Sequence, residues 1–326
     1  MIVRNPQRTA FFRIQTSVPM DTTTHTASSH MKNTRTVLAY LALTAFALIS
    51  NQLYSQCAIP VQGCAGVDLS AYGAGSGTNA SLIEYDNFVA AYHSTLARTA
   101  DGSFRVWGQV MANNGTSNVL SPLAINATNY TALTGTVLKG GIGSEGGGNT
   151  QGIVLTTTGL WAWGTEGAVI DPSLTASTTF QKLTIGGNTE GLPSGVTPGQ
   201  VKMMFVTDET IAITTCDGAA YVISSRTNMN QGGTATTWTQ VRTNAGGDPF
   251  ITNVVAMRGG FSTLMALKND GTLWTWGELS YLGDGSAVLA RNRATQMTLP
   301  AGVTIKMFGA TYDELNAPTQ ASQYLL

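Results

Sequence analysis

The chain contains four similar segments at a nearly constant spacing, and this repeat constrains the fold more than any other feature of the sequence. Each segment has an apolar run, a tight turn ending in glycine, and a second run that usually closes on Trp-Gly. The turn glycines are Gly102, Gly159, Gly218 and Gly271, which gives spacings of 57, 59 and 53 residues. A period of this size indicates stacked supersecondary units rather than one irregular domain.

Three of the four turns are Asp-Gly pairs between short apolar runs, which is a strong signal for a β-hairpin. The glycine tolerates a positive φ, and the aspartate side chain accepts hydrogen bonds from the local backbone. Asp101, Asp217 and Asp270 therefore need no metal-binding or acid–base role, because equivalent positions of successive units lie apart in a repeat protein.

The second run of each unit carries aromatic residues at matching positions. Trp107, Trp163 and Trp276 share one position, and apolar residues occupy the opposite face of the run. Apolar residues on both faces predict a small sheet packed between two neighbours. The Trp pairs of units two and four would also suit carbohydrate stacking, but strand aromatics with a period of two favour packing between units. Trp238 lies outside the motif, and we expect it to be exposed.

The remaining residues of each unit supply a second pair of short β-rich runs. Four strands in a period of about 56 residues predict an all-β fold, a β-propeller of four-stranded blades. The third unit departs from the pattern, with Tyr221–Ser224 in place of the Trp-Gly ending. The predicted units are 87–140, 150–205, 208–258 and 260–310 within a propeller region of 87–326, with the start of a fifth unit at 320–326.

The fourth unit reads LMALKNDGTLWTWGELSYLGDGS from Leu264 to Ser286. It resembles the blade signature of the regulator of chromosome condensation repeats, and the resemblance covers the chain from Val89 to its end. Members of that family typically form seven-bladed propellers, so about four repeats imply an incomplete, open propeller. We therefore expect this chain to be a fragment of a longer protein, with exposed strand edges that favour association.

Residues near the N-terminus have the layout of a secretory signal peptide. Lys32 and Arg35 precede the uncharged apolar run 37–50, and Ser55 offers a small residue for cleavage. The run of 14 residues is short for a membrane span, and a single-pass anchor is the alternative. We expect a mis-assigned start or disordered leader at 1–30, a signal peptide at 31–55, and an N-terminal linker or first strand at 56–86.

The charge balance of the secreted form excludes several kinds of partner. Residues 1–56 hold five of the 17 basic and one of the 18 acidic residues, so 12 basic and 17 acidic residues remain and the net charge is −5. This balance does not suit a nucleic-acid backbone or an anionic membrane surface. We expect a secreted or cell-surface protein with no membrane span after signal cleavage and no nucleic-acid partner.

Cysteine and histidine are scarce in the chain. Cys57 and Cys64 could form a small local disulfide, with two free thiols as the alternative. Cys216 is isolated, and we expect a small buried hydrophobic residue there. His93 is the only histidine after the predicted signal peptide. We therefore predict no metal site, no cofactor and no catalytic residue.

Variation between the units concentrates in three loops, at 140–148, 186–199 and 281–286. Binding residues usually lie on loops held by a rigid scaffold. We expect a binding module that recognises a protein or glycan through one face of the propeller. The alternative is a propeller hydrolase or lyase, which would require His93 and carboxylates to converge at one end of the channel.

Overall fold

The computed structural model describes most of the propeller region and is almost entirely β-structure. The described residues are 88–91, 93–99, 101–109, 111, 117–146, 149–164, 177–183, 188–207, 209–234, 237–260, 263–278, 290–305, 308–310 and 324–325. The predicted leader, signal peptide and linker at 1–86 lie outside them. No helix in the described ranges is long and apolar enough to cross a membrane, and only a short 3-10 helix, η4 (Pro198–Gln200), occurs there.

Four antiparallel sheets of four strands account for the fold, and each sheet consists of strands that are consecutive in the chain. Blade 1 contains β1 (Phe88–Ala91), β2 (Ser94–Arg98), β3 (Phe104–Gly108) and β4 (Val119–Ala124). Blade 2 contains β5 (Val137–Gly146), β6 (Asn149–Thr156), β7 (Gly159–Gly164) and β8 (Ser177–Lys182). Blade 3 contains β9 (Val201–Thr207), β10 (Thr210–Thr215), β11 (Ala220–Ser224) and β12 (Thr239–Gln240). Blade 4 contains β13 (Val254–Gly259), β14 (Thr263–Lys268), β15 (Leu273–Gly277) and β16 (Arg291–Gln296).

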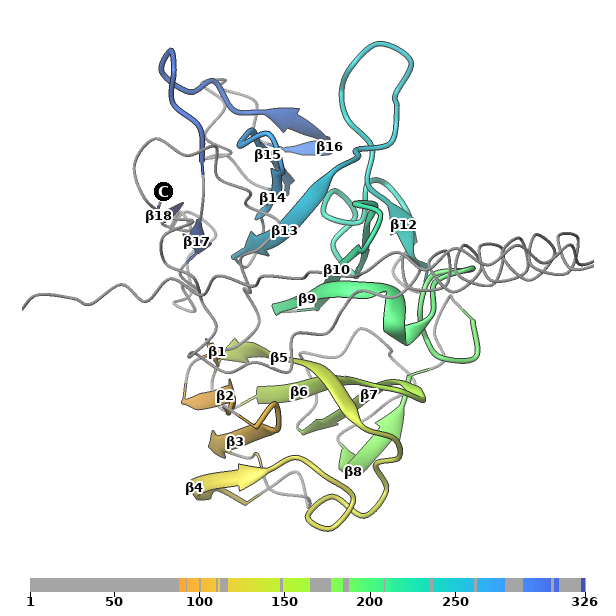
Figure 1. Cartoon of the computed structure of the whole chain (residues 1–326), viewed down its shortest axis with the longest axis vertical. Helices are drawn as coiled ribbons and strands as arrows, with labels where there is room; N and C mark the ends of the chain where they lie inside the picture. Colours follow the sequence, from red (N-terminus) through yellow and green to blue (C-terminus); the bar gives the residue numbers. More distant parts are fainter. Residues whose placement is uncertain are drawn as a thin grey trace, which may run out of the picture. The chain divides into compact units, whose positions relative to one another are not determined.

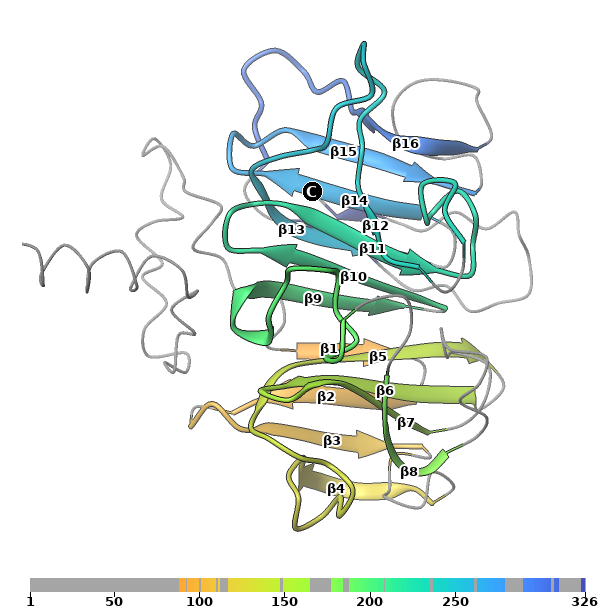
Figure 2. The same ribbon diagram turned by 90° about the vertical axis from the view of Figure 1, so that its right-hand side faces the viewer.

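The blades follow one another in chain order (Figures 1 and 2). The first strand of each blade contacts the first strand of the next, so β1, β5, β9 and β13 form the inner edge and the fourth strands form the outer rim. A further short pair, β17 (Gly309–Ala310) with β18 (Tyr324–Leu325), follows blade 4, and β17 contacts β13. This arrangement confirms the predicted all-β, partial propeller of four-stranded blades.

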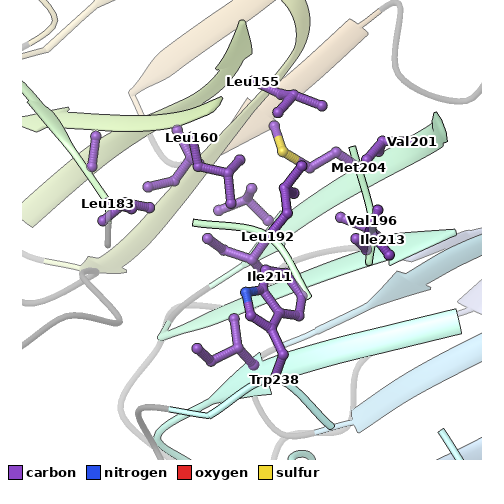
Figure 3. Close-up of a cluster of buried hydrophobic side chains, with 14 of the residues drawn as sticks. Leu155, Leu160, Leu183, Leu192, Val196, Val201, Met204, Ile211, Ile213 and Trp238 are labelled. Carbon is purple, nitrogen blue, oxygen red and sulfur yellow. The ribbon is translucent and has the colours of Figure 1, made fainter. Parts of the chain in front are cut away.

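Hydrophobic clusters fill the space between neighbouring blades. Phe104 of blade 1 packs with Trp163 of blade 2 in one cluster, and Leu155 of blade 2 packs with Met204 of blade 3 in the next (Figure 3). A third cluster joins blades 3 and 4, and a fourth covers the far face of blade 4. Each inner blade is thus apolar on both faces, because each face meets a neighbour.

The glycine-rich segment 140–148, which we expected to be a loop insertion, belongs to the inner strand β5 as far as Gly146. That prediction is wrong, because these glycines serve close packing rather than a turn. A Cβ atom on Gly141 would lie 2.5 Å from Val206 Cγ2 of blade 3, and one on Gly140 would lie 2.8 Å from Leu96 Cδ1 of blade 1. The inner strands converge here and leave no space for a side chain at these two positions.

Trp238 is buried, so the prediction of an exposed aromatic at this position is also wrong. Its side chain enters the cluster between blades 2 and 3 (Figure 3), with 8% of its surface exposed. The indole Nε1 donates a hydrogen bond of 2.9 Å to the Gly191 carbonyl. A residue outside the repeat motif therefore contributes to the same packing as the residues within it.

Candidate functional site

The predicted turn residues lie at one end of the blades, which we call the turn end. Gly102, Gly159, Gly218 and Gly271 all adopt positive φ angles, between 80° and 124°. Asp101 Oδ1 accepts hydrogen bonds from Thr99 Oγ1 and from the backbone N–H of Ser103.

These hydrogen bonds also set the acidity of the turn carboxylates. The bonds from Thr99 and Ser103 hold the pKa of Asp101 well below its usual range. At Asp270, partial burial opposes ionisation, but hydrogen bonds from Thr272 outweigh it and lower the pKa of the carboxyl. The arrangement gives both aspartates a structural task in the hairpin.

The three matching tryptophans have different surroundings. Trp163 Nε1 donates to the Met111 carbonyl at 3.2 Å, and Trp276 Nε1 donates to the Met229 carbonyl at 2.9 Å. Each bond reaches the preceding blade, and both indoles are fully buried. Trp107 in blade 1 is only partly buried.

The cysteines and His93 do not form a reactive cluster among the described residues. Cys216 is exposed beside the turn, contrary to the expected buried position, and it is disulfide-bonded to a residue outside the described ranges. Cys57 and Cys64 also lie outside those ranges. His93 is exposed, with Nδ1 2.7 Å from Gln109 Oε1.

One cavity lies at the outer rim, where blade 3 meets β16 of blade 4. Its volume is about 490 Å³. The lining consists of one alanine and six polar or basic residues: Asn228, Asn244, Ala290, Arg291, Asn292, Arg293 and Thr295. We call this cavity the rim cavity.

Backbone pairing brings the two walls of the rim cavity together. Thr243 forms a parallel bridge with Ala294, in which Ala294 N–H donates to the Arg242 carbonyl and Asn244 N–H donates to the Ala294 carbonyl. Ala294 itself is buried. This bridge fixes alternate residues of β16, Arg291 and Arg293, along the boundary between the blades.

Side-chain contacts hold Arg293 in place. Its Nε donates to Asp248 Oδ1 at 2.5 Å, and its Nη1 donates to the Gln231 carbonyl at 2.7 Å. The Arg293 hydrogen bond, together with the charges of Arg293 and Arg242, lowers the pKa of the Asp248 carboxyl. Arg293 Nη2 makes no hydrogen bond in this part of the chain, so two N–H groups of the guanidinium are available to a ligand.

The second arginine also lines the rim cavity. Arg291 Nη1 donates to Thr295 Oγ1 at 2.9 Å, and its side chain is half-buried. Opposite it, the backbone N–H and the side-chain amide of Asn228 donate to the Glu278 carboxylate at 2.6 and 2.9 Å. The lining contains two arginines and no carboxylate, and the carboxylates of Asp248 and Glu278 each accept hydrogen bonds from one lining residue. Guanidinium and amide donors in such a cavity suit a carboxylate ligand.

Two further cavities lie at the turn end. One, of about 270 Å³, is lined by Ser194–Val196 from the predicted variable loop and by Cys216, Asp217 and Tyr221. Burial, followed by the Asp217 charge, raises the pKa of the Tyr221 phenol. The other, of about 470 Å³, is lined mainly by residues 296–304 after β16. Neither has a positively charged lining, which distinguishes both from the rim cavity.

Sequence reasoning missed the arginines of the rim cavity. On a strand, two basic residues at alternate positions such as Arg291 and Arg293 are an ordinary surface pattern, so the sequence analysis did not single them out. The available signal was the pair of arginines two positions apart, which share one face of a strand. Their place in the rim cavity depends on loops of blade 3 that no sequence pattern connects with them.

Comparison with known proteins gives similarity of fold. No protein-family model matches the chain, and no curated protein sequence matches it. The chain is similar to the crystal structure of human WBSCR16, with a TM-score of 0.50 and 18% identity over 70% of this chain and 57% of that chain. For Prp20p from Saccharomyces cerevisiae, described with its binding to Gsp1p and histones, the TM-score is 0.48 and the identity 18%, over 68% of this chain and 52% of that one.

This chain therefore spans little more than half the length of these two solved structures. The WBSCR16 match confirms, at the level of fold, the predicted resemblance to the regulator of chromosome condensation repeats. At 18% identity the match concerns the fold alone.

Proposed function

We propose that this chain is a secreted or cell-surface β-propeller that binds a protein partner through loops and the outer rim of its blades. Acidic side chains of the partner enter the rim cavity. The observation that carries this proposal is the pair Arg291 and Arg293, held on one face of β16 beside the loops of blade 3.

Several features support a binding role. The blades pack through continuous apolar clusters, which gives a rigid scaffold for residues at the rim. Arg293 is fixed by Asp248 and the Gln231 carbonyl, so little conformational freedom remains to be lost when a carboxylate binds. The predicted signal peptide and acidic net charge favour an extracellular protein partner over a nuclear one.

No specific observation favours the hydrolase or lyase alternative. Within blade 1, His93 precedes the first residue of β2 and Asp101 lies in the turn after its last residue, so the two residues lie at opposite ends of the blade. Among the described residues, no group of three or more His, Cys, Asp or Glu side chains could hold a metal ion.

Selection of displayed random peptides on the full chain would test the proposal. We expect enriched peptides to carry neighbouring Asp or Glu residues and to lose at least ~10-fold in affinity for Arg291→Gln, because one charge-assisted pair is removed. Lys182→Gln removes the same charge from the outer strand of blade 2 and is the matched control, for which affinity should be unchanged.

Two outcomes would contradict the proposal. Enriched peptides without carboxylates, or peptides whose binding is the same for both variants, would exclude the rim cavity as the binding site. Binding of an oligogalacturonate, an acidic oligosaccharide, in preference to any peptide would assign the cavity to glycans rather than proteins. Circular dichroism of both variants checks that the fold is retained.

A further inference from the structure

The smaller cavity at the turn end, which we call the turn cavity, has one wall made by residues of the segment 188–200 before β9. Asn188 organises this segment, because its Nδ2 donates to the Val196 carbonyl at 2.8 Å. Its Oδ1 accepts hydrogen bonds from the backbone N–H groups of Glu190 and Leu192 at 3.1 and 3.0 Å. Leu192 and Val196 are buried in the cluster between blades 2 and 3. Hydrogen bonds and packing therefore hold this wall in place.

The end of the segment is tied to the turn of blade 3. Gln200 Oε1 accepts a hydrogen bond of 2.8 Å from the backbone N–H of Thr197, and the Gln200 carbonyl accepts one of 3.0 Å from the backbone N–H of Cys216. Cys216 is disulfide-bonded, so it contributes no thiol to the cavity. A cavity whose wall is fixed in this way loses little conformational freedom when a ligand binds.

The opposite wall presents two hydrogen-bond acceptors. Asp217 Oδ1 accepts from Thr215 Oγ1 and from the backbone N–H of Ala219. In the part of the chain that the structure describes, Asp217 Oδ2 and Tyr221 Oη have no hydrogen-bond partner, and no basic side chain pairs with Asp217. Burial, and secondly the Asp217 charge, raises the pKa of the Tyr221 phenol, so the phenol is neutral and lies within electrostatic reach of the carboxylate.

The matching turn of blade 4 shows what such a pair of side chains can hold. Asp270 precedes the turn glycine of blade 4 as Asp217 precedes that of blade 3. Trp274 and Tyr221 each follow the turn glycine by three residues. Lys268 Nζ lies 3.6 Å from Asp270 Oδ2 and 5.8 Å from the centre of the Trp274 ring. Blade 4 thus holds a cation of its own chain beside a carboxylate and an aromatic ring.

Blade 3 has no such cation in its own turn. The residue at the position of Lys268 is Thr215, a neutral side chain that donates to Asp217 Oδ1. The turn cavity, of about 270 Å³, lies at this point, and no arginine, lysine or histidine is among the described residues that line it. A carboxylate beside an aromatic ring attracts ammonium and guanidinium groups. The cavity therefore has the chemistry of a binding site for a cation.

We propose that the turn cavity binds a lysine or arginine side chain of a protein partner, in the arrangement that Lys268 has in blade 4. The cationic group pairs with Asp217 Oδ2 and lies against Tyr221, and the aliphatic part of the side chain fills the cavity. Its N–H groups also donate to the Tyr221 oxygen. The site lies at the turn end of blade 3, so this inference goes beyond the proposed function and does not depend on the rim cavity.

An NMR titration of the isotope-labelled full chain tests the inference, with the amide signals of Gly218 and Ala219 as the readout. The probes are acetylated, amidated peptides of sequence Gly-Gly-Xaa-Gly-Gly, in which Xaa is Arg, Lys or Gln. We expect the Arg and Lys peptides to bind and the Gln peptide not to bind. Asp217→Asn keeps the shape of the turn and should weaken Arg-peptide binding by at least ~5-fold, because a charge-assisted pair is lost. Asp270→Asn, in the matching turn of blade 4, is the control and should bind as the wild type does.

A second variant keeps the test decisive if Asp217→Asn alters the turn. Thr215→Lys gives blade 3 the lysine of blade 4, which should occupy the cavity and abolish binding of the Arg peptide. Arg291→Gln, which tests the rim cavity, should leave binding of the Arg peptide unchanged, so the two proposals can fail separately.

The following results would overturn the inference. One is equal binding of the Arg and Gln peptides, and another is undiminished binding of the Arg peptide to Asp217→Asn or to Thr215→Lys. Binding of free putrescine, a small diamine, in preference to the Arg and Lys peptides would assign the cavity to free amines rather than to a protein partner, and would equally overturn it.

Discussion

At the scale of single residues, the three tryptophans of the repeat motif differ in burial and hydrogen bonding because the residues around them differ. The sequence predicted the shared position of Trp107, Trp163 and Trp276 from the spacing of the repeats. It could not predict the carbonyl acceptors, Met111 O and Met229 O, because these lie on loops of another blade. Trp238 was mispredicted for the same reason, since its acceptor lies on a loop that precedes blade 3.

Replacement of Trp276 by phenylalanine should lower the free energy of unfolding by ~2–3 kcal/mol, because a cavity forms and a buried carbonyl loses its donor. Trp274→Phe on the same strand should cost less than ~1 kcal/mol, since Trp274 is half-exposed and donates only to the nearby Thr272 hydroxyl. Urea unfolding of both variants measures the difference. Equal losses of unfolding free energy in the two variants would contradict a stabilising role for the hydrogen bond from Trp276 to the Met229 carbonyl.

Lys202 should destabilise the fold at neutral pH. Burial, and secondly the charge of Lys139, lowers the pKa of its ammonium group. A lysine whose pKa is lower in the folded state than in the unfolded state opposes folding while it is protonated. The free energy of unfolding therefore rises as pH increases from the pKa of the folded state to the pKa of the unfolded state. We therefore expect Lys202→Met to raise the thermal midpoint at pH 7 by ~2 °C.

The matched control for this charge effect is Lys182→Met, on the outer strand β8. Its midpoint should remain close to that of the wild type. The advantage of Lys202→Met should shrink as pH approaches 10, because the wild-type lysine then loses its proton in the fold. A lower midpoint for Lys202→Met at pH 7 would show that the ammonium group is stabilising.

At the scale of strands and turns, the hairpins were predictable and the inner strands were not. An Asp-Gly pair favours a tight turn through its own backbone conformation, so the turn can be predicted from the adjacent residues alone. The glycines of β5 carry no such local signal, because the space they save is occupied by Leu96 and Val206 of other blades. Glycine usually marks loops in sequences, and here tertiary packing overrides that preference.

Gly141→Ala should destabilise the chain by ~2 kcal/mol, because its Cβ would lie 2.5 Å from the Val206 side chain in a crowded region. Gly199→Ala introduces the same methyl group where no atom lies within 4 Å, and should be neutral or slightly stabilising. Chemical denaturation compares the two. A neutral Gly141→Ala would mean that the inner strands have room to separate.

The bridge at the rim cavity should weaken in acid. The pKa of Asp248 is lowered in the folded chain, first by the hydrogen bond from Arg293. The ionised carboxylate therefore stabilises the fold at pH values above its pKa in the unfolded chain, near 3.8, and this stabilisation is lost as pH falls. Asp248→Asn should therefore speed amide exchange at Asn244 and Ala294 at neutral pH. In this variant, amide exchange at these two residues should then change less between pH 5 and pH 2 than in the wild type. Quenched hydrogen exchange with mass spectrometry measures the difference.

At the scale of the whole molecule, the number and order of the blades were predictable, whereas the contacts between them were not. The repeat fixed four units because each carries its own hairpin signal. The rim cavity depends on β16 meeting residues some 50 positions earlier through the Thr243–Ala294 bridge. Neither residue has a distinctive type, so no local pattern indicates that contact.

Stability should be distributed between nearest neighbours along the row of blades. Leu160 is fully buried between blades 2 and 3, so Leu160→Ala should cost ~2–4 kcal/mol. We expect native-state hydrogen exchange to accelerate in β6, β7 and β10 and to remain unchanged in β15. Equal acceleration in all four blades would show that the row unfolds as one unit.

The pairing of Gly152 with Trp163 has a consequence for how such sequences can diverge. In the register of β6 and β7 these residues face each other, and a Cβ atom on Gly152 would overlap the indole ring. In blades 1 and 4 the corresponding partners are Thr95 and Leu264, so glycine is not required by the repeat itself. Descendants of this chain could therefore acquire a side chain at position 152 only after, or together with, a smaller residue at position 163, and the two sites should covary in the lineage.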